Sequence, residues 1–418
     1  MEIDFLTAEA EINRGRKHFH LMVKPIGAVC NLHCTYCYYL EKSNLYPKPQ
    51  SECRMSDEVL KLYIKNYISS QPTENHRVVF AWQGGEPTLL GVEFFERAVE
   101  LQRQYSDGRQ IENTLQTNGM LIDERWAVFF KEHKFLIGIS IDGPQDLHDA
   151  YRRTQSGVGS WKRVMKSIDL LKIHGVKFNT LTVVNSLNGD HPLRVYNFLK
   201  SIGSDWMQFI PIQERKSADK NQLLRLVAND YTEETTVTKE SVQPEQWGNF
   251  LITIFDQWVR NDVGSVFIKQ FDCALEAWCG YNPTACTQSR YCGEGLVMEH
   301  NGDVYSCDHF VYPQFKLGNI KEQPLQEMAS SVSQTKFGKD KRQTLSVQCQ
   351  NCKYLAACNG ECPKHRFTTN DAGEKIAYLC RGYYNFYDHA APFLHAMRTL
   401  IKQGGKASSI MNFLAIDN

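Results

Sequence analysis

The chain has 418 residues, and 42% of them are hydrophobic, which is enough for a large domain with a second one beside it. Its 47 basic side chains equal its 47 acidic ones, so the charge gives no reason to expect a nucleic-acid partner or an anionic membrane surface. No run of 18 apolar residues could cross a bilayer, and residues 1–18 lack the apolar core of a secretory signal, so we expect a cytoplasmic protein.

Apolar, β-rich segments alternate with amphipathic ones through the first half of the chain. Alternation of this kind predicts parallel βα units. Six such units suit an incomplete, TIM-like (β/α)6 barrel better than a closed eight-unit one, and we assign it to residues 18–240. The expected strands are 19–25, 78–84, 113–119, 136–143, 178–184 and 206–212, and the expected helices are 57–68, 93–105, 124–133, 161–175 and 191–203.

Three cysteines follow the first expected strand, spaced Cys30-x3-Cys34-x2-Cys37. Three thiolates can hold three irons of a 4Fe–4S cluster, and because no fourth Cys lies nearby, the fourth iron is free for another ligand. A zinc site or a set of buried thiols is the alternative. Zinc sites usually pair two Cys-x2-Cys units or add His ligands, and the spacing of His33 fits no such pattern.

Glycines and polar residues gather where the expected strands end, which is where barrels of this kind carry their sites. Gly84-Gly85-Glu86-Pro87 follows the second strand. Its glycines would let the backbone approach a ligand closely, and the Glu86 carboxylate could bind a ligand ammonium. A Gly-Gly pair after a strand is, on its own, usually only a turn. Thr117-Asn118-Gly119 ends the third strand, Ser140 and Asp142 lie at the end of the fourth, and Ile212 closes the sixth.

The second half of the chain carries another set of cysteines. Residues 213–245 are polar and predict a surface insertion or linker, and a helix is expected at 245–262. Eight cysteines then equal two complete four-thiolate sites, whereas a zinc ribbon would explain only one Cys-x2-Cys unit. Without an export signal, so many cysteines favour metal ligation over disulfides. The eight are Cys286, Cys292, Cys307, Cys349, Cys352, Cys358, Cys362 and Cys380.

Six segments occur in an order and spacing that resemble the anaerobic sulfatase-maturating enzymes, from about residue 18 to about residue 400. They are CNLHCTYCYYLEK, FAWQGGEPTLLG, LQTNG, SIDGP, NGDVYSCDHFV and CNGECPKHRF. The resemblance implies a radical S-adenosylmethionine (SAM) oxidoreductase that converts a Cys or Ser of a sulfatase polypeptide to Cα-formylglycine. It also implies a cysteine-rich SPASM domain, assigned to residues 265–385, and a C-terminal helical tail at 386–418.

The same resemblance implies three 4Fe–4S clusters and SAM as cofactors. Cys30, Cys34 and Cys37 would hold the cluster whose open iron binds SAM. The ordinary alternatives are a core role for Ile212 and a solvated cation for Arg152. The SAM contacts implied are Tyr36, Gly84, Gly85, Glu86, Ser140, Arg152 and Ile212.

By resemblance, the C-terminal cysteines form two interleaved ligand sets for auxiliary clusters. One set is Cys286, Cys292, Cys307 and Cys362, and the other is Cys349, Cys352, Cys358 and Cys380.

The resemblance also gives Asp308, directly after a ligand, the part of general base, which a carboxylate in a desolvated pocket can play. A turn-capping Asp is the alternative. Cys53, Cys273 and Cys279 receive no role, because a spare Cys is most often a small buried hydrophobe.

The implied partners are an unfolded or nascent sulfatase polypeptide and a small electron donor such as flavodoxin or ferredoxin, with no nucleic acid and no membrane. One rival is a SPASM enzyme that forms a thioether or carbon–carbon crosslink in another peptide. Only about 17 residues precede the first strand, too few for the winged-helix domain that many such enzymes carry. The other rival is a zinc-binding or electron-transfer protein without chemistry of its own. Colour and metal analysis test it, because zinc without iron would favour this class.

Overall fold

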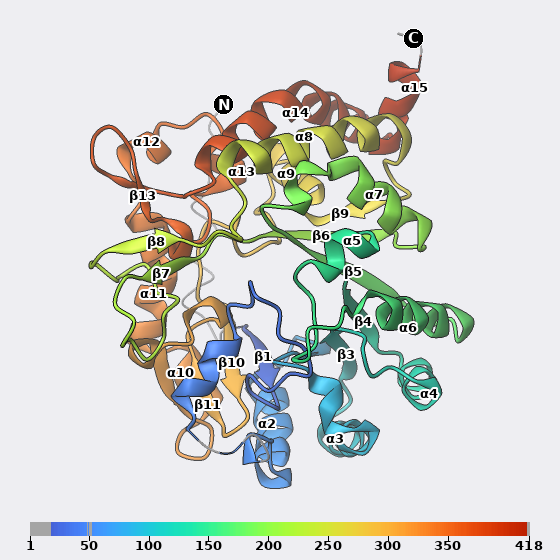
Figure 1. Ribbon diagram of the computed structural model, residues 1–418, viewed down its shortest axis with the longest axis vertical. Helices are drawn as coiled ribbons and strands as arrows, with labels where there is room; N and C mark the ends of the chain where they lie inside the picture. The colour runs from blue at the N-terminus through green and yellow to red at the C-terminus, as the bar shows by residue number, and fades with distance from the viewer. Residues whose placement is uncertain (1–17, 48, 50–51, 416–418) are drawn as a thin grey trace.

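The computed structural model describes residues 18–47, 49 and 52–415. The N-terminal segment examined for a secretory signal lies, but for its last residue, outside this range. Six parallel strands follow one another in chain order along one curved sheet (Figure 1). This confirms the six predicted βα units. The strands are β1 (His20–Lys24), β2 (Arg77–Trp82), β3 (Gln110–Thr117), β4 (Leu136–Ser140), β5 (Phe178–Val184) and β6 (Trp206–Pro211).

The connecting helices cover the outside of this sheet (Figure 1). Their starts are set by local sequence: Ser56 and Asp123 accept hydrogen bonds from the amides of Val59 and Trp126, and Pro192 occupies a first turn. Large side chains such as Tyr63 and Trp82 fill the layer between helices and strands. The helices are α2 (Asp57–Ser70), α3 (Val92–Tyr105), α4 (Glu124–Glu132), α5 (Gln145–Asp149), α6 (Trp161–Ile173) and α7 (Pro192–Ser201).

The sheet does not stop at the six barrel strands. β10 (Gly295–Glu299) pairs in parallel with β1 along its whole length, and β11 (Asp303–Tyr305) and β12 (Lys316–Asn319) continue outward from it in antiparallel order. At the far edge β9 (Phe267–Ile268) pairs with β6. The sequence pattern did not reveal these strands. They bring the segment after β11, which carries Cys307 and Asp308, to the β1 side of the barrel.

The segment 213–245, predicted as a surface insertion or linker, is an insertion that folds back on the barrel and not a linker. It contains a hairpin of β7 (Arg215–Ser217) and β8 (Thr235–Val237), and Gln213 and Glu214 are buried. Glu41, just beyond the cysteine loop, accepts a hydrogen bond from the amide of Leu226 at 2.8 Å. The segment therefore packs over the cysteine loop instead of leaving the domain.

The C-terminal part centres on two long helices that lie side by side (Figure 1), α8 (Pro244–Asn261) and α14 (Cys380–Lys402). They approach closely at Gly248 and Gly382, where an added Cβ on Gly248 would lie 2.9 Å from the partner Cα. The predicted SPASM domain ends at residue 385, inside α14. The division into a barrel, a SPASM domain and a C-terminal helical tail therefore stays a prediction. The other helices are α9 (Lys269–Trp278), α10 (Leu325–Ala329), α11 (Val332–Gln343), α12 (Val347–Gln350), α13 (Leu355–Cys358) and α15 (Ile410–Leu414), and the last strands are β13 (Thr368–Thr369) and β14 (Lys375–Ile376).

Short 3-10 turns connect these elements, and they are labelled η. They are η1 (Leu40–Leu45), η3 (Pro87–Leu90), η4 (Asn188–Asp190), η5 (Asp308–Phe310), η6 (Pro313–Phe315), η7 (Pro363–His365) and η8 (Ala407–Ser409). Among the described residues, none of the helices has the length and apolar character needed to span a membrane.

Candidate active site

The loop after β1 gathers the three predicted cluster cysteines. Burial, the Glu86 carboxylate and the Cys37 thiol raise the pKa of Cys30 to about 12. Burial also raises the pKa of Cys34 to about 12, with contributions from Cys37 and Cys30, while the Arg152 cation acts in the opposite direction. All three thiols are free, and these effects on the pKa show that each lies within electrostatic reach of the others. Three converging thiols beside a cation fit a cluster that takes three protein ligands.

The glycine-rich loop after β2 is bound to this cysteine loop through its backbone. The amide of Gly85 donates to Gly27 O at 2.7 Å, and the amide of Glu86 donates to Val29 O at 2.9 Å. A Cβ on Gly85 would lie 1.9 Å from Val29 O, so only glycine permits this approach. The preceding Gly84 has a φ of +133°, which also favours glycine.

The Glu86 carboxylate is fully buried and holds two strand ends together. Its Oε1 accepts hydrogen bonds from the amide and hydroxyl of Thr88 and from the hydroxyl of Thr117, and its Oε2 accepts from the amide of Asn118 at 2.7 Å. The contacts that the structure shows for this carboxylate are therefore with protein groups. Its predicted contact with a ligand ammonium stays a prediction.

Tyr36 and Arg152 meet at Asp142, a fully buried carboxylate that the sequence placed at a strand end but not in the site. The Tyr36 hydroxyl and the Arg152 Nε both donate to Asp142 Oδ2, the latter at 2.9 Å. The amide of Val183 donates to Oδ1 at 3.0 Å. Arg152 is 7% exposed, which contradicts the alternative of a solvated cation. Ser140 and Ile212 are buried at the carboxyl ends of β4 and β6.

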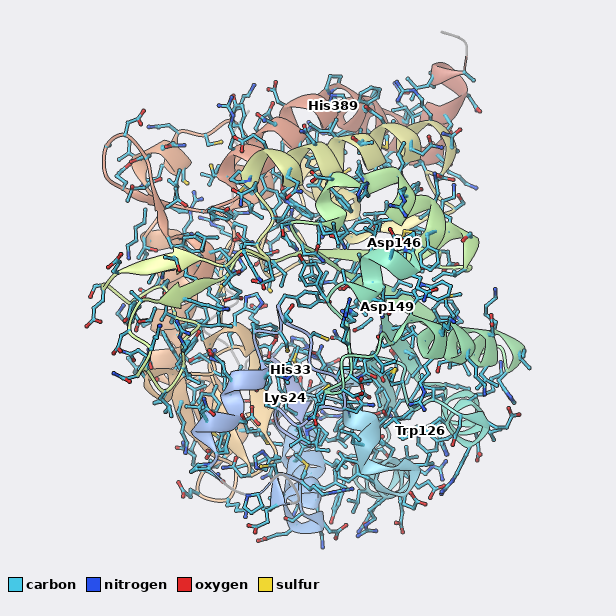
Figure 2. All side chains as sticks on the ribbon, in the orientation of Figure 1. Lys24, His33, Trp126, Asp146, Asp149 and His389 are labelled. Atoms are coloured by element: carbon cyan, nitrogen blue, oxygen red, sulfur yellow. The ribbon has the colours of Figure 1, made fainter. Side chains whose placement is uncertain are left out.

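Asp308 lies in a second buried group, built around the end of β1. Lys24 Nζ lies 2.7 Å from Asp308 Oδ1, and the Tyr38 hydroxyl donates to Oδ2 at 2.5 Å. The Lys24 ammonium also lies 3.7 Å from the ring centre of Tyr39, and the side chain, labelled in Figure 2, is 2% exposed. Burial acts to raise the pKa of Asp308, but Lys24 and then His309 hold it below its usual value. The carboxylate thus contacts side chains of distant segments, unlike a turn-capping Asp.

Electrostatic influences link the C-terminal cysteines within each of the two predicted sets, and the sets themselves stay a prediction. Burial raises the pKa of Cys362 well above its usual value, and the nearby Glu361, Cys292, Cys307 and Cys286 raise it further. Burial and Cys380, Glu361 and Cys349 raise the pKa of Cys358 to about 12, and Cys380 in turn lies near Cys349 and Cys352. Each set supplies four thiols, as a fully ligated 4Fe–4S cluster requires. Of the remaining cysteines, Cys53 and Cys273 are buried.

Comparisons with known proteins agree with this geometry. The Radical SAM superfamily matches residues 25–199, and the SPASM iron-sulfur cluster-binding domain matches residues 286–353. The chain is 48% identical over 401 residues to a serine-type anaerobic sulfatase-maturating enzyme of Bacteroides thetaiotaomicron, covering 95% of each chain. The chain belongs to the anaerobic sulfatase-maturating enzymes.

Further members support the same conclusion. A cysteine-type enzyme of Clostridium perfringens is 34% identical over 91% of this chain and 99% of its own. The solved structure described as native anSMEcpe with bound AdoMet and Cp18Cys peptide matches with a TM-score of 0.79 at 33% identity, over 92% of this chain and 99% of that one. A Streptococcus suis SuiB structure, at 14% identity and a TM-score of 0.60, shares the fold alone.

Membership of the sulfatase-maturating family confirms several predictions. It confirms the partial barrel with a SPASM domain, the radical SAM oxidoreductase, and the cofactors, which are SAM and three 4Fe–4S clusters. The rival of a zinc-binding or electron-transfer protein without catalysis is wrong. The roles assigned to individual residues stay predictions.

This sulfatase-maturating enzyme also has a buried group of charges that the sequence did not reveal. Lys42 is 3% exposed, and its ammonium lies 3.5 Å from the ring centre of Tyr312 but has no hydrogen-bond partner among the described residues. Burial and the nearby Lys364 lower the pKa of Lys42 to about 7. Lys364 donates to Glu214 Oε1 at 2.7 Å, whereas Glu214 Oε2 is without such a partner in the described part of the chain. Lys364 lies in the CPKHRF part of one of the six motif segments, which is the one sequence feature that points to this group of charges.

Proposed function

We propose that this chain oxidises a Ser residue of a sulfatase polypeptide to Cα-formylglycine. The observation that carries the choice of Ser is the 48% identity over 95% of the chain to a serine-type enzyme. Two further serine-type enzymes, from Klebsiella aerogenes and Klebsiella pneumoniae, are 37% and 36% identical, whereas the cysteine-type enzyme of Clostridium perfringens is 34% identical. Cys remains the other target that this family uses.

We infer that the cysteine loop and the strand ends hold SAM. Cys30, Cys34 and Cys37 would ligate the cluster, which with SAM supplies the radical that removes a hydrogen atom from the target Cβ. Asp142 engages the Nε of Arg152, so the two terminal nitrogens of the guanidinium would serve a ligand carboxylate. The residues proposed to contact SAM are Tyr36, Gly84, Gly85, Glu86, Ser140, Arg152 and Ile212.

Asp308 is the proposed general base. Oxidation of a Ser side chain to an aldehyde requires its hydroxyl to lose a proton, and an ionised carboxylate can accept that proton. Lys24, at 2.7 Å, favours the ionised form of Asp308 in a buried setting where a carboxylate alone would become protonated. Tyr38 fixes the second oxygen, so the carboxylate is held in one orientation.

The surroundings of Asp308 and Lys42 are the proposed site for the polypeptide. Lys42 lies within electrostatic reach of both Glu214 and Asp308. A buried ammonium and a buried carboxylate oxygen without hydrogen-bond partners are costly, unless a ligand completes them. A peptide group offers both a carbonyl for Lys42 and an N–H for Glu214. We therefore propose that these two side chains bind the backbone next to the target residue.

The remaining partners and the compartment are also proposals. A small flavodoxin or ferredoxin is the electron donor that we propose. The cytoplasm is the proposed compartment, because it keeps thiols reduced, as iron ligation requires.

The proposed function is tested with three peptides that differ only in Ser, Cys or Ala at the target position. Each is incubated anaerobically with the reconstituted enzyme, SAM and a strong reductant, and the aldehyde is captured with a hydrazide and identified by mass spectrometry. We expect aldehyde from the Ser peptide at a higher rate than from the Cys peptide, and none from the Ala peptide. Aldehyde from Cys alone would refute the choice of Ser. A crosslink without aldehyde would support the rival peptide-modifying reaction.

A further inference from the structure

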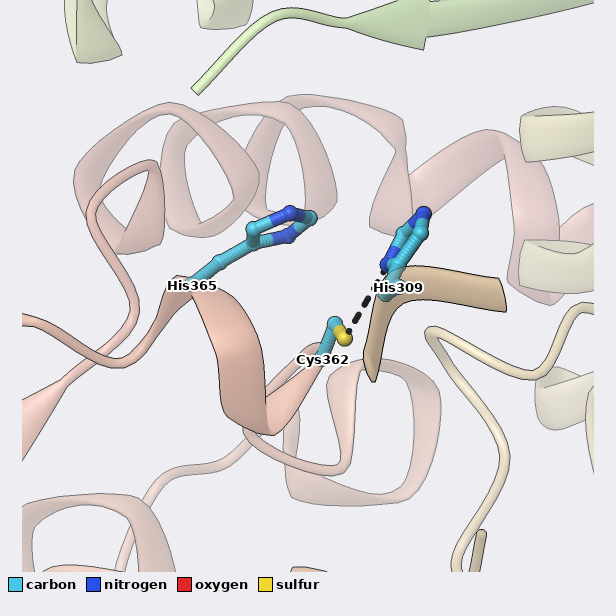
Figure 3. A group of neighbouring side chains, drawn as sticks. All are labelled: His309, Cys362 and His365. Carbon is cyan, nitrogen blue, oxygen red and sulfur yellow. Dashed lines mark hydrogen bonds between the residues drawn. The ribbon is translucent and has the colours of Figure 1, made fainter. Parts of the chain in front are cut away.

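His309 follows Asp308 directly, yet the two side chains reach different parts of the site. Both lie in η5, whose turn is closed by a hydrogen bond from the amide of Phe310 to Cys307 O. Asp308 contacts Lys24 and Tyr38, as described above. His309 Nδ1 instead lies 3.5 Å from Cys362 Sγ (Figure 3). A single turn thus joins the proposed base to a proposed cluster ligand.

The chemistry of Cys362 fixes the direction of this hydrogen bond. A cysteine that ligates iron is a thiolate, so its sulfur has no proton to donate and can only accept. His309 Nδ1 must then carry the hydrogen, whether the imidazole is neutral or charged. Cys362 is 7% exposed, so water does not compete freely for the sulfur.

His365, the other imidazole in this group, has a different partner. Its Nδ1 lies 2.8 Å from Glu361 Oε2, and its ring centre is 5.3 Å from that of His309 (Figure 3). His309, Cys362 and His365 do have ligand atoms within 4.8 Å of one another, as a mononuclear metal site would. Such a site would remove Cys362 from its set of four thiols. We therefore assign the contact as a hydrogen bond.

We propose that His309 donates a hydrogen bond to the Cys362 thiolate and thereby raises the reduction potential of the cluster held by Cys286, Cys292, Cys307 and Cys362. Reduction adds one negative charge, which is partly carried by the sulfur ligands, so an N–H dipole stabilises the reduced form more than the oxidised form. His309 is in this view a tuning residue that does not touch the substrate.

The effect of this hydrogen bond on the reaction rests on the proposed function, the oxidation of Ser. When a Ser CH2OH becomes CHO, it loses one hydrogen atom to the SAM-derived radical, one proton to Asp308 and one electron. We assign that electron to the cluster beside Asp308, whose charge falls from 2+ to 1+. A higher reduction potential makes this transfer more favourable.

The test uses the full-length chain with Cys30, Cys34 and Cys37 replaced by Ala, so that only the two auxiliary clusters contribute. Their midpoint potentials are measured by EPR at controlled potentials. In the His309→Phe variant we expect one of the two midpoints to fall. At the parent midpoint the ratio of reduced to oxidised cluster should drop about tenfold, equivalent to about 59 mV for one electron.

Two further variants distinguish the effect of losing the hydrogen bond from the effect of losing an imidazole ring. His309→Asn places an amide N–H near the position of Nδ1, and we expect a midpoint close to that of the parent. The control is His389→Phe on α14, at the top of the view in Figure 2, whose imidazole pairs with Asp256 at 2.7 Å and not with a cysteine, and neither midpoint should move. An unchanged midpoint in His309→Phe with the same iron content as the parent would overturn the proposal.

A second measurement decides the matter if His309→Phe fails to load iron. Pulsed EPR on the wild-type holoenzyme with [15N]histidine should detect one imidazole nitrogen coupled to a reduced auxiliary cluster, and the coupling should be absent in His309→Asn. Absence of any such coupling in the wild type would also overturn the proposal. Neither readout needs substrate, so a wild-type enzyme that forms no aldehyde would refute the proposed function alone.

Discussion

Two aspartates flank the cysteine loop, Asp142 fully buried and Asp308 partly buried, and their surroundings differ. Asp142 and Asp308 each accept a hydrogen bond from a tyrosine next to Cys37, and each pairs with a cation. Asp142 also accepts from the backbone amide of Val183, so its partners are a hydroxyl, a guanidinium and an amide. Asp308 has only a hydroxyl and an ammonium as its hydrogen-bond or ion-pair partners within the described part of the chain.

This difference separates a structural carboxylate from one that can change its partners. An amide and a guanidinium N–H can only donate, so the oxygens of Asp142 must remain acceptors. A hydroxyl can reverse its role, and the side chain of Asp308 is 17% exposed where that of Asp142 is 0%. Asp308 is thus the aspartate that can accept a proton without breaking the fold.

The largest effect should follow from breaking the loop that both aspartates flank. Cys30→Ala removes one of three thiolates from the SAM-binding cluster, and we expect 5′-deoxyadenosine and aldehyde formation to fall to background. Iron should decrease from about twelve to about eight atoms per chain, because the eight C-terminal cysteines are intact. Iron analysis and chromatography of the nucleoside check this. SAM cleavage above background in this variant would contradict the assignment of the loop.

The next effect tests Asp308 itself. Asp308→Asn removes the proton acceptor but allows the new amide to donate to the Tyr38 hydroxyl while its oxygen still faces Lys24. We expect aldehyde formation to fall by about 10²- to 10⁴-fold, which is typical for loss of a general base. Peptide-dependent 5′-deoxyadenosine should persist, and the thermal midpoint should fall less than in the matched Asp142 variant, because the amide oxygen still faces the Lys24 ammonium. Aldehyde formation at the wild-type rate would exclude Asp308 as the base.

The matched change at Asp142 should affect stability instead. In Asp142→Asn the amide must face either the Val183 amide or Arg152, and neither can accept its hydrogen. Breaking a buried ion pair of this kind costs about 3–5 kcal/mol. Thermal unfolding of both variants, compared with the wild type, measures the difference. Equal midpoints for Asp142→Asn and Asp308→Asn would show that the two sites do not differ as described.

Features of the fold and site that neighbouring residues determine could be predicted from the sequence. Features that depend on contacts between distant segments could not. The βα units and the helix starts follow from local patterns, such as the cap at Ser56, and the motifs located Asp308 and the cysteines. The pairing of β10 with β1 joins segments far apart in the chain, which no local pattern encodes. The burial of Arg152 and Lys42 was missed for a related reason. Charged residues are usually exposed, and only the packed fold shows which ones are enclosed.

The smallest effect concerns Lys42, which by the proposed function binds the polypeptide backbone at the expense of stability. Folding lowers its pKa from 10.5 to about 7, so between these pH values the unfolded chain binds more protons. Stability should therefore rise with pH across this window, and the destabilising ammonium is fully present below pH 7. Lys42→Met removes that charge, so the gain in thermal midpoint over the wild type should be larger at pH 6.5 than at pH 8.5.

Peptide affinity should change in the opposite direction. If the Lys42 ammonium binds a peptide carbonyl, the Kd of the wild type should rise between pH 6.5 and 8.5 as the ammonium loses its proton. In Lys42→Met the Kd should be higher by about tenfold at pH 6.5, equivalent to about 1.4 kcal/mol, and should no longer vary with pH. The control is Lys353→Met, because Lys353 is an exposed lysine paired with Asp388. If Lys42→Met is more stable than the wild type but binds the peptide with the same Kd, the ammonium is destabilising as described but does not bind the substrate.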